Sequence, residues 1–207
     1  MSECALSVKA PLTNRPEHPR TITLDKSIGI FSLVFLEDNE HLLSAGSDGL
    51  IRQWRVEDGA EVKAQRLKAS GSVGTIALSA DGNWIVGGGL KVANLWNRKT
   101  RQVAHTVGEH GNWVDMVDFS PDSTRFATGS RDKRAIIWNI SNGKKLIGPL
   151  EHSDAVASLR FSPDGNRLAV AVYTAELRVY NANNGQLIAN IAVHMGHINT
   201  ISWLGDS

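Results

Sequence analysis

The side chains that could do chemistry in this chain are histidines, hydroxyls and acidic residues. His110, Thr128 and Asp132 are of the types that combine in nucleophilic catalysis, where a carboxylate orients a histidine base that activates a hydroxyl. His194 and His197 lie three residues apart and could bind zinc through their imidazole nitrogens. Three consecutive glycines within residues 86–90 (VGGGL) could cradle a phosphate group.

The same residues belong to a repeat with a period of 42 residues. The segments that begin at Glu109 and Glu151 align along their length, and both carry Phe-Ser-Pro-Asp at one offset. Three sets of side chains share the period: Trp54, Trp96, Trp138 and Tyr180; His110, His152 and His194; and Phe119, Phe161 and Trp203. A catalytic constellation should break a repeat rather than follow it, so we interpret these residues as structural.

The repeat also weakens the metal and phosphate interpretations. Histidines of successive repeats do not converge on one ion, and His194 and His197 have no cysteine or carboxylate in register nearby. No helix is expected after the glycine run, so it favours a tight turn in which the second repeat has lost one residue. We therefore expect no cofactor and no metal.

The pattern within each repeat predicts four short strands. Runs of four to seven residues, rich in apolar and β-branched side chains, alternate with Ser-Pro-Asp, Gly-Ser or Asn-Gly turns, and no window shows a helical stripe. Examples are the runs at 114–119 and 156–161, and EVKAQRL is the fourth run of its repeat. A four-stranded antiparallel sheet cannot bury both faces alone, whereas sheets stacked radially can.

With this pattern, residues 20–207 resemble the WD40 repeat family, whose unit has Gly-His near its start and Trp-Asp at the end of its third strand. The first pair reads Glu109-His110, Glu151-His152 and Val193-His194 here, and the second reads Trp54-Arg55, Trp96-Asn97, Trp138-Asn139 and Tyr180-Asn181. The terminal Asp is absent throughout, which departs from the family pattern. The resemblance implies an all-β fold of WD40-type β-propeller blades: four complete four-stranded repeats plus part of a fifth, in an incomplete ring.

The predicted organisation follows the repeat phase. Residues 1–19 form a flexible lead, residues 20–25 an outer closing strand, and residues 194–207 a partial fifth repeat with one strand, INTISWL. The complete repeats span 26–67, 68–109, 110–151 and 152–193. Because propellers usually need about four to eight blades, we expect a truncated product, a fragment, or a protomer that needs another chain.

The resemblance implies a hydrogen-bonded network of His, Ser or Thr, Asp and Trp inside each blade. The third repeat matches at every position, with His110, Thr128, Asp132 and Trp138. The other repeats match in part: the first has Lys26, Ser44, Asp48 and Trp54; the second has Lys68 and Leu90 at the His and Asp positions; the fourth has His152, Val170, Thr174 and Tyr180.

The resemblance also places a binding face at residues just after the His and just before the turn Asp. Those positions hold Trp113, Asp115, Arg131, Tyr173, Phe31 and Ser47, with Gly29, His197 and Asn199 as further members. Exposed Trp and Arg are preferred anchors of protein interfaces. Two interpretations of Trp113 stay open: an interface anchor, or a lid over the neighbouring blade.

Charge balance and cysteine content favour some classes of function over others. The chain has 22 Lys and Arg against 21 Asp and Glu, and this balance argues against direct contact with nucleic acid or an anionic membrane. One cysteine and no apparent secretory signal favour the cytoplasm or the nucleus. We expect a non-catalytic scaffold or adaptor that binds proteins or peptides, with self-association covering open blade edges. The alternatives are an enzyme or small-molecule binder that uses the propeller channel, and a fragment without independent function.

Overall fold

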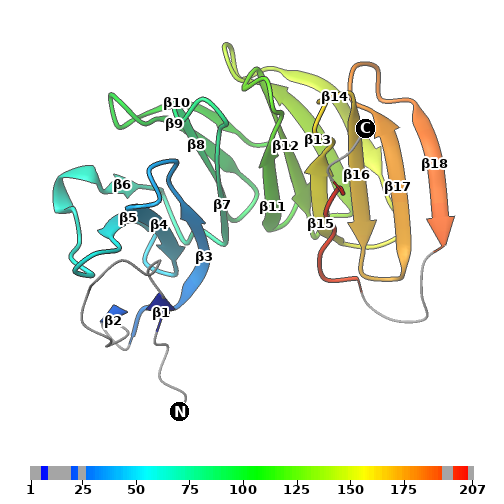
Figure 1. Cartoon of the computed structure of the whole chain (residues 1–207). Helices are drawn as coiled ribbons and strands as arrows, with labels where there is room; N and C mark the ends of the chain where they lie inside the picture. The colour runs from blue at the N-terminus through cyan, green and yellow to red at the C-terminus, as the bar shows by residue number, and fades with distance from the viewer. Residues whose placement is uncertain (1–5, 9–19, 23–26, 193–197, 205–207) are drawn as a thin grey trace.

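Four four-stranded sheets lie in a row (Figure 1), and we call them blades one to four in chain order. The computed structural model describes residues 6–8, 20–22, 27–192 and 198–204. Blade one comprises β3 (Ile30–Phe35), β4 (His41–Gly46), β5 (Leu50–Arg55) and β6 (Leu67–Lys68). Blade two comprises β7 (Thr75–Leu78), β8 (Trp84–Gly88), β9 (Ala93–Asn97) and β10 (Gln102–Val107). Blade three comprises β11 (Val114–Phe119), β12 (Arg125–Ser130), β13 (Arg134–Asn139) and β14 (Lys145–Glu151). Blade four comprises β15 (Val156–Phe161), β16 (Arg167–Val172), β17 (Glu176–Asn181) and β18 (Leu187–Ala192).

Every blade is an antiparallel meander whose neighbouring strands pair in chain order, which confirms the predicted all-β class and the four complete four-stranded repeats. The turn between the third and fourth strands shows how the sequence sets this geometry. Gly59, Arg101, Gly143 and Gly185 each have a φ of 60–77° and follow one another at the repeat period. Their left-handed backbone, which glycine adopts without strain, reverses the chain at the same point of each blade.

The apolar core lies between the blades rather than within each one. Phe126 and Trp138 of blade three pack with Val86 and Leu95 of blade two. Blades one and two, and blades three and four, bury similar clusters. Successive blades are also tied through hydrogen bonds, as where Asp118 accepts one from the Phe161 amide at 2.8 Å. The turns at the ends of the strands are therefore held on a packed scaffold.

The glycine run forms the turn between β8 and β9. Four residues lie between the paired Gly88 and Ala93, whereas five lie between Gly129 and Ala135 in blade three. The predicted loss of one residue in the second repeat is thus confirmed.

The fourth strand of blade one differs from its prediction. Only Leu67 and Lys68 pair as β6, and Lys63–Gln65 form a short 3₁₀ helix, η1. Five residues separate Glu61, which bridges to Trp54, from Leu67, whereas three separate the in-phase Val103 and Val107 of β10. The two extra residues cannot follow the ladder, so they bulge outward as η1.

The described residues at the two ends of the chain form little regular structure. Within the predicted lead, Leu6–Val8 form β1, which pairs antiparallel with β2 (Arg20–Ile22). Residues 198–204 form no strand, because no partner strand lies beside them among the described residues. They still occupy the phase of a next first strand, since the Ile201 amide bonds Ser158 Oγ at 3.2 Å and Trp203 Nε1 bonds the Arg160 carbonyl at 3.1 Å. Closure of a ring by residues 20–25 stays a prediction.

Candidate functional site

The four residues singled out in the third repeat form one chain of hydrogen bonds. His110 precedes β11, Thr128 lies on β12, Asp132 is in the β12–β13 turn and Trp138 is on β13. His110 Nδ1 lies 3.0 Å from Asp132 Oδ2, and its Nε2 lies 2.7 Å from Thr128 Oγ1. Trp138 Nε1 donates to the same Thr128 oxygen at 2.9 Å. The Gly111 amide donates to Asp132 Oδ2 at 2.7 Å.

Electrostatics fix the proton positions in this network. Burial alone raises the pKa of Asp132, but hydrogen bonds from the Gly111 amide and from His110 outweigh it and hold the pKa below its ordinary value. Burial lowers the pKa of His110. The neutral imidazole therefore donates from Nδ1 to an ionised Asp132 and accepts the Thr128 proton at Nε2.

This geometry favours structure over catalysis. Thr128 is fully buried, and its hydroxyl already donates to His110 and accepts from Trp138. A nucleophilic hydroxyl must reach a substrate, and this one has no free face to offer. The network instead links two strands, β12 and β13, to the turn between them and to the segment that precedes β11.

Blade one keeps half of the network and replaces the rest. Trp54 Nε1 donates to Ser44 Oγ at 2.8 Å, as in blade three. Asp48 instead binds Arg52, and this guanidinium is the main cause that lowers the pKa of Asp48. The predicted Lys26 lies outside the described residues. A salt bridge within blade one therefore takes the place of the histidine contact.

Blades two and four have lost the network in different ways. In blade two, Gly87 pairs with Asn94 where Thr128 pairs with Ile136, so the hydroxyl is missing. In blade four, Val170 replaces the hydroxyl, and both ring nitrogens of His152 are buried without a hydrogen-bond partner. Burial lowers the pKa of His152 to about 4.

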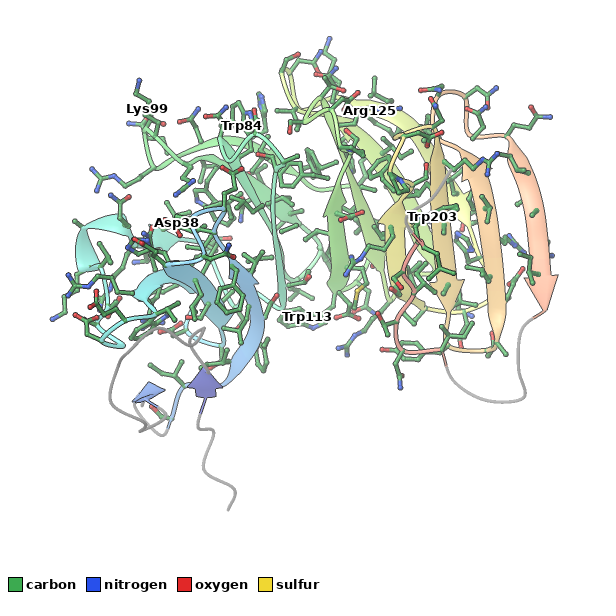
Figure 2. The ribbon with its side chains drawn as sticks, viewed as in Figure 1. Asp38, Trp84, Lys99, Trp113, Arg125 and Trp203 are labelled. Atoms are coloured by element: carbon green, nitrogen blue, oxygen red, sulfur yellow. The ribbon has the colours of Figure 1, made fainter. Side chains whose placement is uncertain are left out.

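The residues proposed for binding lie at one end of the blades, where Figure 2 labels Trp113. Arg131 donates from Nε and Nη2 to the two oxygens of Asp115, at 2.6 and 3.3 Å, while its side chain stays 57% exposed. The Asp115 carboxylate raises the pKa of Arg131, with a further contribution from Tyr173. Tyr173 is itself exposed. The structure thus brings Asp115, Arg131 and Tyr173 together across blades three and four.

Trp113 is half-buried and joins this group at the side of blade two. Its backbone bridges to Leu90, and its carbonyl accepts the Arg131 amide at 2.9 Å. Leu90, at the in-phase position of Asp132, is 54% exposed and was not among the predicted binding-face residues. A large apolar residue at a turn tip where the repeat carries an acid is the signal that could have identified it.

Phe31 and Ser47 form a separate group in blade one. Phe31 is exposed, and Ser47 Oγ accepts the Gly29 amide at 2.9 Å. Asn199 is exposed, and His197 lies outside the described residues. We use the name Trp113 face for Trp113, Asp115, Arg131, Tyr173 and Leu90.

The described residues contain no group of three His, Cys, Asp or Glu side chains placed to hold a metal ion. Among those residues, no helix has the length and hydrophobicity to cross a bilayer.

Comparison with known proteins adds family evidence. A family model described as "WD domain, G-beta repeat" matches residues 18–55 and 101–139, and one described as "Anaphase-promoting complex subunit 4 WD40 domain" matches 147–206. The guanine nucleotide-binding protein subunit beta of Dictyostelium discoideum is 30% identical over 122 residues, which is 56% of this chain and 35% of that protein. The nuclear distribution protein nudF of Emericella nidulans is 29% identical over 132 residues, 53% of this chain and 30% of that protein.

A solved structure shows the same fold. The structure of U3-55K superposes with a TM-score of 0.73 at 23% identity, covering 84% of this chain and 54% of that chain. The chain therefore spans about a third of the two curated relatives and about half of this solved chain.

Proposed function

We propose that this chain, which belongs to the WD40 repeat family, is a non-catalytic protein-interaction scaffold or adaptor that binds partner proteins or peptides at the Trp113 face. The family is one of protein-interaction propellers, and the particular face is our inference. The observation that carries it is the exposed Arg131 guanidinium, held in place by Asp115 beside the exposed Tyr173. An oriented arginine next to an aromatic ring loses little side-chain entropy on binding, which is why such pairs recur as interface anchors.

The scaffold supports this role physically. Arg131 and Tyr173 lie in turns of adjacent blades that share a buried apolar cluster. Their spacing is therefore set by packed sheets rather than by mobile loops, so the Trp113 face is organised before a partner arrives.

Affinity capture with variant chains tests the proposal. Wild-type protein, a double variant Arg131→Ala with Tyr173→Ala, and the control Lys144→Ala are immobilised, and the captured proteins are quantified by mass spectrometry. Lys144 is exposed at the opposite end of blade three, so it removes a cation without touching the Trp113 face. We expect a defined set of proteins to fall about tenfold or more with the double variant and to persist with the control.

Melting temperatures of all three chains are measured alongside. A capture loss that merely follows a loss of folded protein, or an unchanged set of captured proteins, contradicts the proposal. Trp113→Ala separates the two interpretations of Trp113. If Trp113 is an interface anchor, the variant captures less protein at an unchanged melting temperature. If Trp113 is a lid over the neighbouring blade, the variant melts at a lower temperature.

A further inference from the structure

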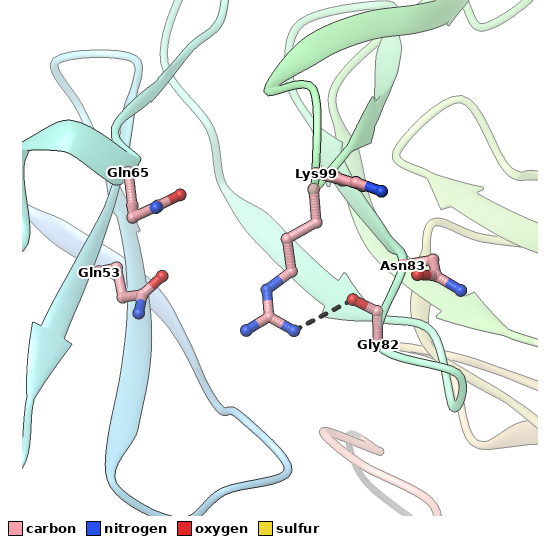
Figure 3. Close-up of a pocket in the computed structure, with 6 residues that line it drawn as sticks. Gln53, Gln65, Gly82, Asn83 and Lys99 are labelled. Carbon is pink, nitrogen blue, oxygen red and sulfur yellow. Dashed lines mark hydrogen bonds between the residues drawn. The ribbon is translucent and has the colours of Figure 1, made fainter.

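A cavity of about 310 Å³ opens between blades one and two. It is lined by Gln53 and Gln65 of blade one and by Gly82, Asn83, Arg98 and Lys99 of blade two, as Figure 3 shows. Figure 2 labels Lys99 at the end of the molecule opposite Trp113, so the cavity is separate from the Trp113 face.

Arg98 stands where the repeat otherwise has a small or medium apolar residue. The in-phase residues of the other blades are Val56, Ile140 and Ala182, and the last two are almost fully buried. In blade two the same position carries a guanidinium, whose Nη1 donates to the Gly82 carbonyl at 3.1 Å (dashed in Figure 3).

Gln53 breaks the repeat in the same way on the facing wall. Its in-phase residues are Leu95, Ile137 and Val179, of which the first two are completely buried. Two independent polar replacements of apolar positions therefore face one cavity. Structural repeats keep such positions apolar to pack the blades, so this departure calls for a role other than packing.

The charges of the cavity are unbalanced. Its lining includes two cations, Arg98 and Lys99, and no carboxylate residue. Glu37 lies against Gly82 but does not line the cavity, and both oxygens of Asp81 already accept hydrogen bonds from Ser79 or Asn83. A cavity lined by two cations attracts a negatively charged group.

We propose that this cavity binds a phosphate monoester carried on a partner peptide, with Arg98 and Lys99 as its cationic ligands. A phosphorylated side chain carries a charge of about −1.5 to −2 and three acceptor oxygens, which matches two cations better than a single carboxylate does. Arg98 can present several donors from one plane, while Lys99 adds a point charge. That the phosphate arrives on a peptide rests on the proposed function; the phosphate site itself does not.

Peptide binding tests the proposal directly. The purified chain is titrated with a degenerate phosphoserine-centred peptide library, with the same library carrying serine, and with phenyl phosphate. We expect the phosphorylated library to bind at least about tenfold more tightly than the serine library, and more tightly than phenyl phosphate.

Variants localise the effect. Arg98→Ile restores the residue of blade three, so the fold should be kept, and phosphopeptide binding should fall at least about tenfold. Lys99→Ala, at an exposed turn, should lower it severalfold without affecting the fold, while Lys144→Ala should leave it unchanged. Unchanged binding by Arg98→Ile and Lys99→Ala, or equal binding of both libraries, overturns the site. Phenyl phosphate binding as tightly as the peptides overturns the peptide source. Variants of the Trp113 face lie outside the cavity, so loss of capture there leaves this test unaffected.

Discussion

Replacing Thr128 with valine isolates the hydrogen-bonded network of blade three. Valine has nearly the shape of threonine, so Thr128→Val removes the hydroxyl without opening a cavity. His110 Nε2 and the Trp138 indole N–H then lose their shared partner. Both side chains are at most 4% exposed, so water cannot replace the lost contacts.

The magnitude follows from two orphaned polar groups. Each buried donor or acceptor left without a partner costs about 1–3 kcal/mol, so we expect a loss of about 3 kcal/mol in the free energy of unfolding. For a chain of this size that loss corresponds to a fall of roughly 6–12 °C in melting temperature.

Urea denaturation followed by tryptophan fluorescence and by circular dichroism measures the loss. Repeat proteins can open blade by blade, so hydrogen exchange of the β12 and β13 amides is recorded as a local readout. Thr128→Ser is the matched control: it keeps the hydroxyl, as Ser44 does in blade one, and should cost only about 1 kcal/mol for the lost methyl. Equal destabilisation by serine and valine would refute the argument, because the hydroxyl would then carry no special role.

Four further outcomes are expected. Val170→Thr should supply the hydroxyl that His152 lacks and raise stability by about 1 kcal/mol, measured as a higher melting temperature; no gain means the ring nitrogens are satisfied in another way. The pKa of His152 is lowered to about 4, so the unfolded chain binds its proton more readily and stability should fall as pH drops from about 6.5 to 4; His152→Leu should flatten that part of the stability profile, and an unchanged slope contradicts it. Gly143→Ala, at a φ of 67°, should cost about 1–2 kcal/mol in urea titrations, and a neutral effect contradicts the strain argument. Replacing Leu33 and Phe35, exposed on one face of β3, with serine should lower any self-association seen by light scattering at unchanged melting temperature.

The repeat phase predicted most of the fold, and the resemblance to the WD40 family implied the network of blade three. The strands and the shortened β8–β9 turn follow from positions that recur in every repeat, whereas the four network residues are complete in blade three alone among the four blades. The predicted outer strand of blade one was wrong because the extra residues in this segment do not change the repeat period. Leu67 lies two residues further from Ile51 than Val107 lies from Ala93, and the two connections that follow each lose one residue. The Trp54 to Trp96 spacing thus stays at 42.

The cavity between blades one and two was not predicted for a related reason. The repeat period identifies residues that keep the phase, and it gives no signal for residues that depart from it. Gln53 and Arg98 each look unremarkable in a local window, one within a strand and the other in a basic turn. Their departure becomes visible only when each is compared with three in-phase apolar residues, and their convergence only when two adjacent blades are packed together. In a repeat protein, the residues that recur at equivalent positions therefore identify the scaffold. Candidate sites are best sought where polar residues on facing blades occupy positions that are apolar in the other repeats.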